Sequence, residues 1–128
     1  MHVYSVKDSL WKPVSLTAAR TKQGVFYPKK GSTCLLVGNT LYCFGGKDNN
    51  GELDNRLGRL NLEKRVWQTD FDLLNNQPYL VPEPRYNANL ECYMNRFLIL
   101  YGGNLGSEME TVNWLWIFDI EESYWHRV

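Results

Sequence analysis

The chain has 128 residues, 44% of them hydrophobic and 14% aromatic, which is enough apolar material for a packed core. Its 14 basic residues balance its 14 acidic residues, so nothing attracts it generally to nucleic acid or to an anionic membrane. No apolar run approaches the roughly 20 residues of a membrane-spanning helix, and 3 cysteines are too few for a disulfide framework. We therefore expect a soluble protein of the cytoplasm, with the nucleus as the alternative.

Residues 1–14, MHVYSVKDSLWKPV, hold two short apolar segments on either side of a charged turn. This arrangement predicts a pair of short strands. Trp11 lies in the second segment, seven residues after Tyr4 in the first. The stretch lacks the unbroken apolar core of a secretory signal peptide, so we expect no such signal here.

Residues 28–71 predict a unit of four short antiparallel strands, which we name a, b, c and d. STCLLV and LYCF flank Gly38-Asn39, a two-residue loop suited to the positive φ of a primed hairpin turn. Strand b ends at Gly45-Gly46, a polar loop follows, and RLGRLNL leads through a charged turn to Trp67. Nothing in this unit has the period of a long amphipathic helix.

Two cysteines are brought together by the turn at Gly38-Asn39, which sets Cys34 opposite Cys43 across the hairpin. A disulfide between such residues is geometrically demanding. We expect two reduced, buried cysteines instead.

Residues 84–128 repeat the same order of elements. NLECYM and FLILY flank Asn95-Arg96, strand b ends at Gly102-Gly103, and NWLWIFDI leads to Trp125. The three tryptophans that end strand d are 56 and 58 residues apart, and each follows a large apolar residue by seven positions (Trp11, Trp67, Trp125; Tyr4, Leu60, Phe118). All five prolines fall between one unit's tryptophan and the first strand of the next unit, where we expect them to interrupt no strand ladder. A four-stranded meander repeated at such a period is typical of a β-propeller blade.

The segments LYCFGG, LILYGG, IFDI and SYW resemble the kelch repeat, and the resemblance covers nearly the whole chain. It departs from the usual pattern in its long period, in Asn61 where the second unit has Asp119, and in Leu60 where an aromatic residue is expected. The resemblance implies an all-β fold, namely a partial propeller of about two and a half blades, whereas closed propellers use about four to eight. Residues 1–14 would be strands c and d of a preceding or closing blade, and 28–71 and 84–128 would be blades.

A partial propeller leaves apolar blade faces uncovered, so stacked repeats need neighbours or caps. We consider three arrangements: a piece of a longer protein whose ring is closed by strands c and d of residues 1–14, an assembly with other copies or a second chain, and a free-standing half-propeller. Glycine at the end of strand b would let that strand end under the adjoining blade, and each tryptophan would pack between blades. The predicted structural residues are Gly45, Gly46, Gly102, Gly103, Trp11, Trp67 and Trp125.

In an a-b-c-d meander the b–c and d–a loops emerge on one face, and here they are the long, varied loops. Binding residues tend to lie on loops held by a rigid scaffold. The kelch resemblance implies partner recognition by polar and basic side chains just after the glycine pair and near the start of strand a. The candidate partner-binding residues are Lys47, Asp48, Asn49, Asn104, Glu108, Lys29, Lys30, Arg85 and Tyr86.

Catalytic chemistry has little support in the sequence. The two histidines, His2 and His126, lie at the ends of the chain, and no spacing resembles a metal site or a phosphate-binding loop. We expect no enzyme activity, no metal and no cofactor. We interpret the basic stretch through Lys29 and Lys30 as a solvated loop, so no nucleic acid is expected as a partner.

The sequence therefore predicts a protein-interaction module that recognises a partner loop or peptide on the b–c/d–a loop face. One alternative is a subunit or fragment that completes a larger propeller through its blade faces, with other copies of itself or the remainder of a ring as partner. Another alternative is the non-catalytic portion of a kelch propeller enzyme. The sequence does not choose among ubiquitin-ligase adaptors, cytoskeletal scaffolds and signalling regulators.

Overall fold

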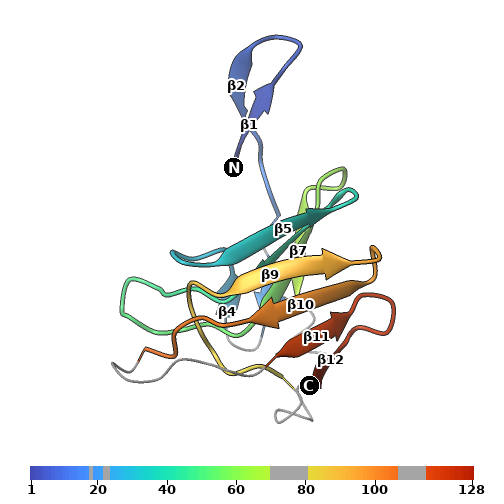
Figure 1. Ribbon diagram of the computed structural model, residues 1–128. Coiled ribbons are helices and arrows are strands. Elements are labelled where there is room, and N and C mark those ends of the chain that lie inside the picture. The colour runs from blue at the N-terminus through green and yellow to red at the C-terminus, as the bar shows by residue number, and fades with distance from the viewer. Residues whose placement is uncertain (18, 22–23, 70–80, 107–114) are drawn as a thin grey trace.

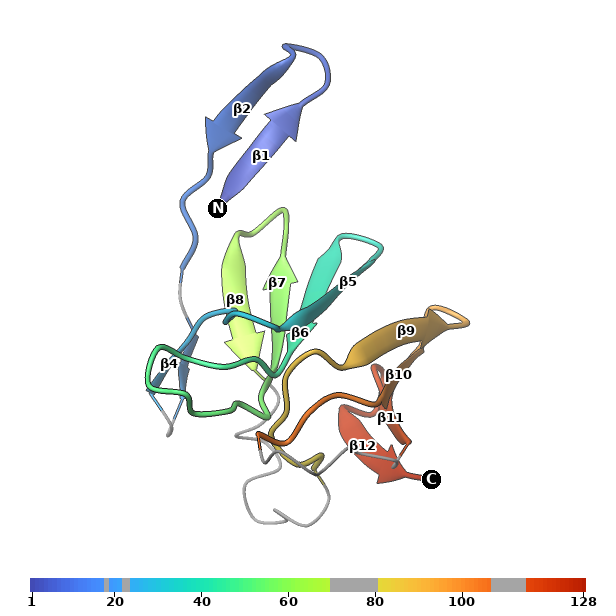
Figure 2. The ribbon, with the colours of Figure 1, turned by 60° about the vertical axis from the view of Figure 1, so that its left-hand side comes forward.

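The computed structural model describes residues 1–17, 19–21, 24–69, 81–106 and 115–128, and these form twelve β-strands and no helix. Two of the sheets have four strands each. They lie side by side, and the N-terminal hairpin stands away from them (Figures 1 and 2). The predicted all-β fold made of blade-like antiparallel sheets is confirmed.

The first four-stranded sheet has the strand order β5-β6-β7-β8, with every neighbouring pair antiparallel. Its strands are β5 (Thr33–Val37), β6 (Thr40–Phe44), β7 (Leu57–Asn61) and β8 (Val66–Thr69). Gly38, with φ of 59°, begins the predicted turn between β5 and β6. The predicted opposition of Cys34 and Cys43 is confirmed, and both are free thiols. Cys43 is buried as expected, but Cys34 is exposed, because it lies on the edge strand of the sheet.

The second four-stranded sheet repeats this order along the chain. Its strands are β9 (Asn89–Tyr93), β10 (Phe97–Tyr101), β11 (Trp116–Asp119) and β12 (Tyr124–Arg127). The two-residue turn predicted at Asn95-Arg96 is wrong, since Tyr93 pairs with Phe97 and three residues connect the strands. The guanidinium of Arg96, the last residue of this turn, donates hydrogen bonds to the Asp119 carboxylate at 2.9 and 3.1 Å.

The main core lies between the two four-stranded sheets. Tyr42 and Phe44 of β6 face a layer of apolar side chains from the second sheet (Leu90, Leu98, Leu100, Trp116, Phe118 and Trp125). The Trp125 ring is 3% exposed and meets the Phe44 ring edge-on, with centroids 5.5 Å apart. The tryptophan of strand d in the second sheet therefore packs across the contact between the sheets.

The opposite face of the first sheet is covered by a segment that the sequence did not predict as structured. A two-stranded sheet, β3 (Ala19–Thr21) and β4 (Gly24–Phe26), precedes β5. The Phe26 ring packs 5.2 Å from the Trp67 ring and is buried with Leu60 and Cys43. Trp67 therefore packs against the segment that precedes β5 and not, as predicted, between the two four-stranded sheets.

Gly58 provides the space that Phe26 occupies. It stands two residues before Leu60, where the second sheet has Trp116 two residues before Phe118. A Cβ added at Gly58 would lie 2.1 Å from an atom of the Phe26 ring. In the second sheet this position holds the indole of Trp116. In the first sheet it holds Gly58, and the Phe26 ring from the preceding segment fills the space.

Gly58→Ala is expected to destabilise the fold by about 1–3 kcal/mol, because the added methyl group overpacks the site of Phe26. Phe26→Ala removes the ring, so Gly58→Ala should be nearly neutral in that background. Thermal or urea unfolding of the two single variants and the double variant measures this coupling. Additive effects of the two substitutions would contradict the packing described here.

The N-terminal hairpin of β1 (His2–Ser5) and β2 (Leu10–Pro13) stands away from both four-stranded sheets (Figures 1 and 2). The Tyr4 and Trp11 rings are 5.3 Å apart at 57°, close to the 5.1 Å and 55° of Phe118 and Trp125. Trp11 is nevertheless 69% exposed, so the structure does not give it the packing role that the repeat predicted. The hairpin has the local geometry of strands c and d, and no described segment covers its aromatic face.

The chain that leaves the hairpin runs along the outer edge of β8. Thr17 donates its backbone N–H to the Arg65 carbonyl at 2.9 Å and accepts one from Trp67 at 2.9 Å. These bonds satisfy part of the free edge of β8, which would otherwise offer unpaired backbone groups.

Candidate partner-binding site

The b–c and d–a loops meet on one side of the two four-stranded sheets. Lys30, which precedes β5, forms an antiparallel bridge with Lys47, which follows β6, through a 2.8 Å hydrogen bond from the Lys47 N–H to the Lys30 carbonyl. Tyr86 and Asn104 form the equivalent bridge in the second unit, with hydrogen bonds of 2.9 and 3.1 Å. Backbone bonds therefore fix the start of strand a against the end of strand b in both units.

The first glycine pair lies beneath the connection that enters the second unit. Gly45 has φ of 74°, and a Cβ there would lie 2.3 Å from the Arg85 carbonyl oxygen. That carbonyl accepts a 2.8 Å hydrogen bond from the Gly46 N–H. Two neighbouring backbones approach closely at this point, and only a residue without a side chain permits the distance.

Arg85 is a structural residue, which corrects its assignment to the partner-binding set. Its side chain is fully buried, and the guanidinium donates hydrogen bonds to the Glu83 carbonyl, the Glu83 carboxylate and the Gly102 carbonyl at 2.9–3.1 Å. Burial lowers the pKa of Arg85, and the charge of Glu83 opposes that shift. Arg85 thus ties the d–a connection to the second glycine pair and offers no donor to a partner.

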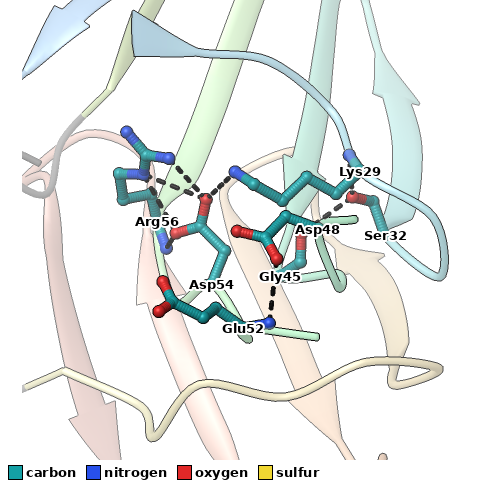
Figure 3. A network of polar contacts seen from close by, with 7 residues as sticks. All are labelled: Lys29, Ser32, Gly45, Asp48, Glu52, Asp54 and Arg56. Carbon is teal, nitrogen blue, oxygen red and sulfur yellow. Dashed lines mark hydrogen bonds and ion pairs between the residues drawn. The ribbon is translucent and has the colours of Figure 1, made fainter. Parts of the chain in front are cut away.

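Lys29 is the second correction. Figure 3 shows its ammonium reaching Asp54 at 2.5 Å, while Arg56 contacts the same carboxylate at 2.7 Å. All three side chains are less than 10% exposed. The two cations also lie over the Phe26 ring, at 6.0 Å for Lys29 and 5.3 Å for Arg56. We name Lys29, Asp54 and Arg56 the buried ion triad.

The buried ion triad keeps Asp54 ionised. Burial alone would raise the pKa of Asp54, but hydrogen bonds from Arg56 and Lys29 outweigh it and hold the pKa below its ordinary value. The Asp54 backbone also donates to the Gly46 carbonyl at 2.9 Å and accepts from the Arg85 N–H at 3.2 Å. The triad therefore anchors the end of the b–c loop to both neighbouring connections.

Asp48 shapes the b–c loop itself. Its Oδ1 accepts hydrogen bonds from the backbone N–H groups of Asn50 and Glu52 at 2.8 and 2.9 Å, and the second of these is drawn in Figure 3. Its own N–H donates to the Glu52 carbonyl at 2.9 Å. The loop is a compact turn around one carboxylate.

A cleft of about 410 Å³ opens between the loops of the two units, and we name it the loop cleft. The Lys47 ammonium lies 5.2 Å from the centroid of the Tyr86 ring that forms one wall. The lining residues are Lys30, Gly31, Lys47, Asp48, Asn49, Gly51, Tyr86 and Asn87. Five of the nine candidate partner-binding residues are among them.

The other candidates lie elsewhere. Asn104 is bridged to Tyr86, a residue of the lining. Lys29 and Arg85 are buried and are not part of the lining, and Glu108 lies outside the described residues. Sequence reasoning missed three lining residues, Gly31, Gly51 and Asn87. The Asn87 N–H donates a 2.8 Å hydrogen bond to the Gly31 carbonyl, which joins Gly31 and Asn87. Both have positive φ, of 76° and 56°, and a glycine or asparagine just before strand a was the signal for them.

Over the described residues, no group of three or more histidine, cysteine, aspartate or glutamate side chains is placed to hold a metal ion. The same part of the chain contains no helix with the length and apolar character needed to cross a membrane.

Four-stranded antiparallel meanders stacked face to face, with glycine pairs under loops of one common face, define blades of a β-propeller. Residues 1–128 match the model of the KLHDC2/KLHL20/DRC7 Kelch-repeats domain, and the chain belongs to this kelch-repeat family. Kelch-repeat domains are generally non-catalytic scaffolds that bind protein partners. The family thus defines a protein-interaction propeller module.

Curated plant proteins are similar to this chain over part of their length. Acyl-CoA-binding domain-containing protein 4 of Arabidopsis thaliana is 31% identical over 97 residues, which are 76% of this chain and 14% of that protein. Acyl-CoA-binding domain-containing protein 6 of Oryza sativa subsp. japonica is 37% identical over 73 residues, which are 57% of this chain and 10% of that protein. The chain therefore spans a small fraction of the length of these relatives. The acyl-CoA-binding domain in their names is a feature of those proteins.

Proposed function

We propose that this chain binds a loop or extended peptide of a partner protein in the loop cleft, by recognition without bond chemistry. The observation that carries the proposal is the convergence of three chain segments on one cleft: residues 30–31, 47–51 and 86–87. They come from two adjacent units, so the cleft depends on the stacking of the sheets. A partner that recognises it therefore recognises the folded propeller segment.

Support for binding also comes from the rigidity of the rim. The Lys30–Lys47 and Tyr86–Asn104 bridges, the Arg85 hydrogen bonds and the buried ion triad all fix backbone next to the cleft. A preorganised surface loses little conformational entropy on binding, so a few anchor side chains can supply most of the affinity. Tyr86 and Lys47, which contact each other, are the proposed anchors.

Selection of displayed random peptides on the immobilised full chain tests the proposal. We expect peptides that bind the wild-type chain and lose binding to Tyr86→Ala, while they keep binding to Tyr93→Ala. Tyr93 is an exposed aromatic residue at the opposite loop end of its sheet, so it is the matched control. Failure to select any peptide, or equal binding to both variants, would exclude the loop cleft as a peptide site.

A second candidate function is assembly through the N-terminal hairpin. The observation that favours it is the exposed pair of Tyr4 and Trp11. The residues at the equivalent positions of the last unit, Phe118 and Trp125, are buried against another sheet. Strands supplied by another chain segment or another copy would cover this pair. Light scattering of the full chain tests whether a second copy covers the pair. A discrete oligomer that Trp11→Ser dissociates would support self-assembly through the hairpin. A monomer over a range of concentrations would exclude self-assembly.

A further inference from the structure

We propose that Cys34 and Cys43 form a redox-active pair, in which a small-molecule disulfide converts the two free thiols into a reversible disulfide across the β5–β6 hairpin. The inference is independent of the proposed function, because neither cysteine belongs to the lining of the loop cleft. It rests on the register of the two strands, on the exposure of each thiol and on the contact between them.

The hairpin places the two cysteines where a disulfide between neighbouring strands can form. Gly38-Asn39 is a two-residue loop, so Val37 and Thr40, which flank it, are a hydrogen-bonded pair. Hydrogen-bonded and non-hydrogen-bonded pairs alternate along an antiparallel ladder, which makes Cys34 and Cys43 a non-hydrogen-bonded pair. The Cα atoms of such a pair are about 4.5 Å apart, within the range of about 4.4–6.8 Å that a disulfide requires.

The two thiols differ in their access to solvent. Cys34 is exposed on the edge strand β5, whereas Cys43 is 1% exposed and packs with Phe26 and Trp67 in the smaller core. Leu36, two residues from Cys34 on the same face of β5, is 56% exposed, so solvent reaches this face along the edge strand. Of the two thiols, Cys34 is therefore the one that a dissolved disulfide can meet.

A hydrogen bond between the thiols prepares Cys34 to react. The Cys43 thiol donates to the Cys34 sulfur, and this bond lowers the pKa of Cys34 by more than partial burial raises it. The same hydrogen bond, together with burial, raises the pKa of Cys43. The thiolate is the nucleophile of thiol–disulfide exchange, so the exposed member of the pair is also the activated one. Exposure, a lowered pKa and an adjacent second thiol are the features of a redox-sensitive cysteine.

Oxidation takes place in two exchanges. The Cys34 thiolate attacks one sulfur of the dissolved disulfide, the S–S bond of the oxidant breaks, and one thiolate leaves. Cys43 then loses its proton to solvent and attacks the Cys34 sulfur of the mixed disulfide, and the second thiolate leaves. The two cysteines together lose two electrons and two protons, which convert the oxidant into two thiols.

The first exchange makes the second one easier. The pKa of Cys43 is raised by its hydrogen bond to Cys34, by burial and by the charge of the Cys34 thiolate. Formation of the mixed disulfide removes that thiolate, so its charge and its hydrogen bond no longer hold the proton on Cys43. The product is a strained link between adjacent strands, and strained disulfides are the readily reduced ones. The link is therefore reversible.

The second sheet provides a comparison within the same chain. Cys92 of β9 lies opposite Leu98 of β10, a residue that carries no thiol. The pair of the second sheet that ends two residues before its glycine pair, as Cys43 does in the first, consists of Leu90 and Leu100, and both are buried. Cys92 is therefore the matched control for the dithiol.

Thiol counting on the full chain tests the inference, with glutathione as the probe. The chain is equilibrated in mixtures of reduced and oxidised glutathione, quenched with acid, unfolded and labelled with N-ethylmaleimide, and intact-mass spectrometry counts the labels. We expect three labels on the reduced chain and one, at Cys92, on the oxidised chain, with all three restored by dithiothreitol. Trypsin releases both cysteines of the pair in the peptide 31–47, which should be unlabelled and lighter by two hydrogens.

Three variants separate the roles of the thiols. Cys43→Ala removes the second thiol, so we expect Cys34 to retain glutathione as a mixed disulfide. Cys34→Ala leaves the buried Cys43 without an exposed partner, so Cys43 should stay unmodified in the folded chain. Cys92→Ser should form the same cross-linked peptide as the wild-type chain.

Three free thiols at every ratio of oxidised to reduced glutathione would overturn the inference. A disulfide that joins Cys92 to Cys34 or Cys43 would overturn it as well. So would a glutathione adduct on Cys34 of the wild-type chain that persists at every ratio, because Cys43 would then fail to displace it. Each of these results comes from the wild-type chain, so the test does not depend on whether Cys43→Ala folds.

Discussion

Trp125→Ala is expected to lower the free energy of unfolding by about 3–5 kcal/mol, the usual range for a buried tryptophan. The indole of Trp125 is buried and contacts rings from both four-stranded sheets, Phe44 at 5.5 Å and Phe118 at 5.1 Å. Its loss leaves a cavity at the contact on which the stacking of the sheets depends. Urea unfolding followed by far-ultraviolet circular dichroism measures the change.

Trp11→Ala is the matched control, since Trp11 holds the same position of the repeat. Its ring contacts Tyr4 and is otherwise in solvent, so we expect a change of less than about 1 kcal/mol. Equal destabilisation by the two substitutions would contradict the arrangement in which one tryptophan packs between sheets and the other does not.

Asp54→Asn is expected to destabilise the fold by about 3 kcal/mol, because it leaves the buried cations Lys29 and Arg56 without their carboxylate. Asparagine keeps the size of the side chain, so the effect comes from charge. Asp8→Asn removes the carboxylate of the exposed Lys12–Asp8 pair and should produce no measurable change. An equal effect of both substitutions would show that the buried ion triad does not stabilise the loop.

Acid should remove the advantage of the wild-type chain over Asp54→Asn. The pKa of Asp54 is lowered in the folded state, so its contribution is complete above the unfolded-state pKa of about 3.9 and is lost as the pH falls through the folded-state pKa. The difference in unfolding free energy between the two proteins should therefore be constant near neutral pH and shrink below about pH 4. A difference that stays constant into strong acid would contradict the ionised state of Asp54.

The strands of both units could be predicted because local signals agreed with one another. Gly38, the glycine pairs and the period of the tryptophans all pointed to the same register, and the observed opposition of Cys34 and Cys43 follows from it. The turn after β9 was missed by one residue because Met94 and Asn95 both adopt positive φ, which no glycine signals in the sequence. β3 and β4 were missed because three-residue strands have no measurable period, and Phe26 is placed by the space above Gly58.

The loops that line the candidate site could be predicted from the sequence, but the environment of each charged side chain could not. The shared face of the b–c and d–a loops follows from strand direction, so Lys30, Lys47 and Tyr86 could be placed together. Burial of Lys29 and Arg85 could not be foreseen, because it depends on partners distant in sequence: Asp54 is 25 residues from Lys29, and the Gly102 carbonyl is 17 residues from Arg85. A basic residue near a loop looks the same in sequence whether it faces a partner or neutralises a buried carboxylate.

The detached hairpin gives the chain an optical property of its own. Among the four tryptophans that the structure describes, Trp67, Trp116 and Trp125 are buried and Trp11 is exposed. Of these four, Trp11 should have the most red-shifted fluorescence and be the most readily quenched by iodide. Replacing Trp114, which lies outside the described residues, with phenylalanine would leave Trp11 as the single water-exposed indole. Any surface that docks on β1 and β2 would then shift the Trp11 emission to shorter wavelength. Coverage of the hairpin could therefore be measured from intrinsic fluorescence, without a label.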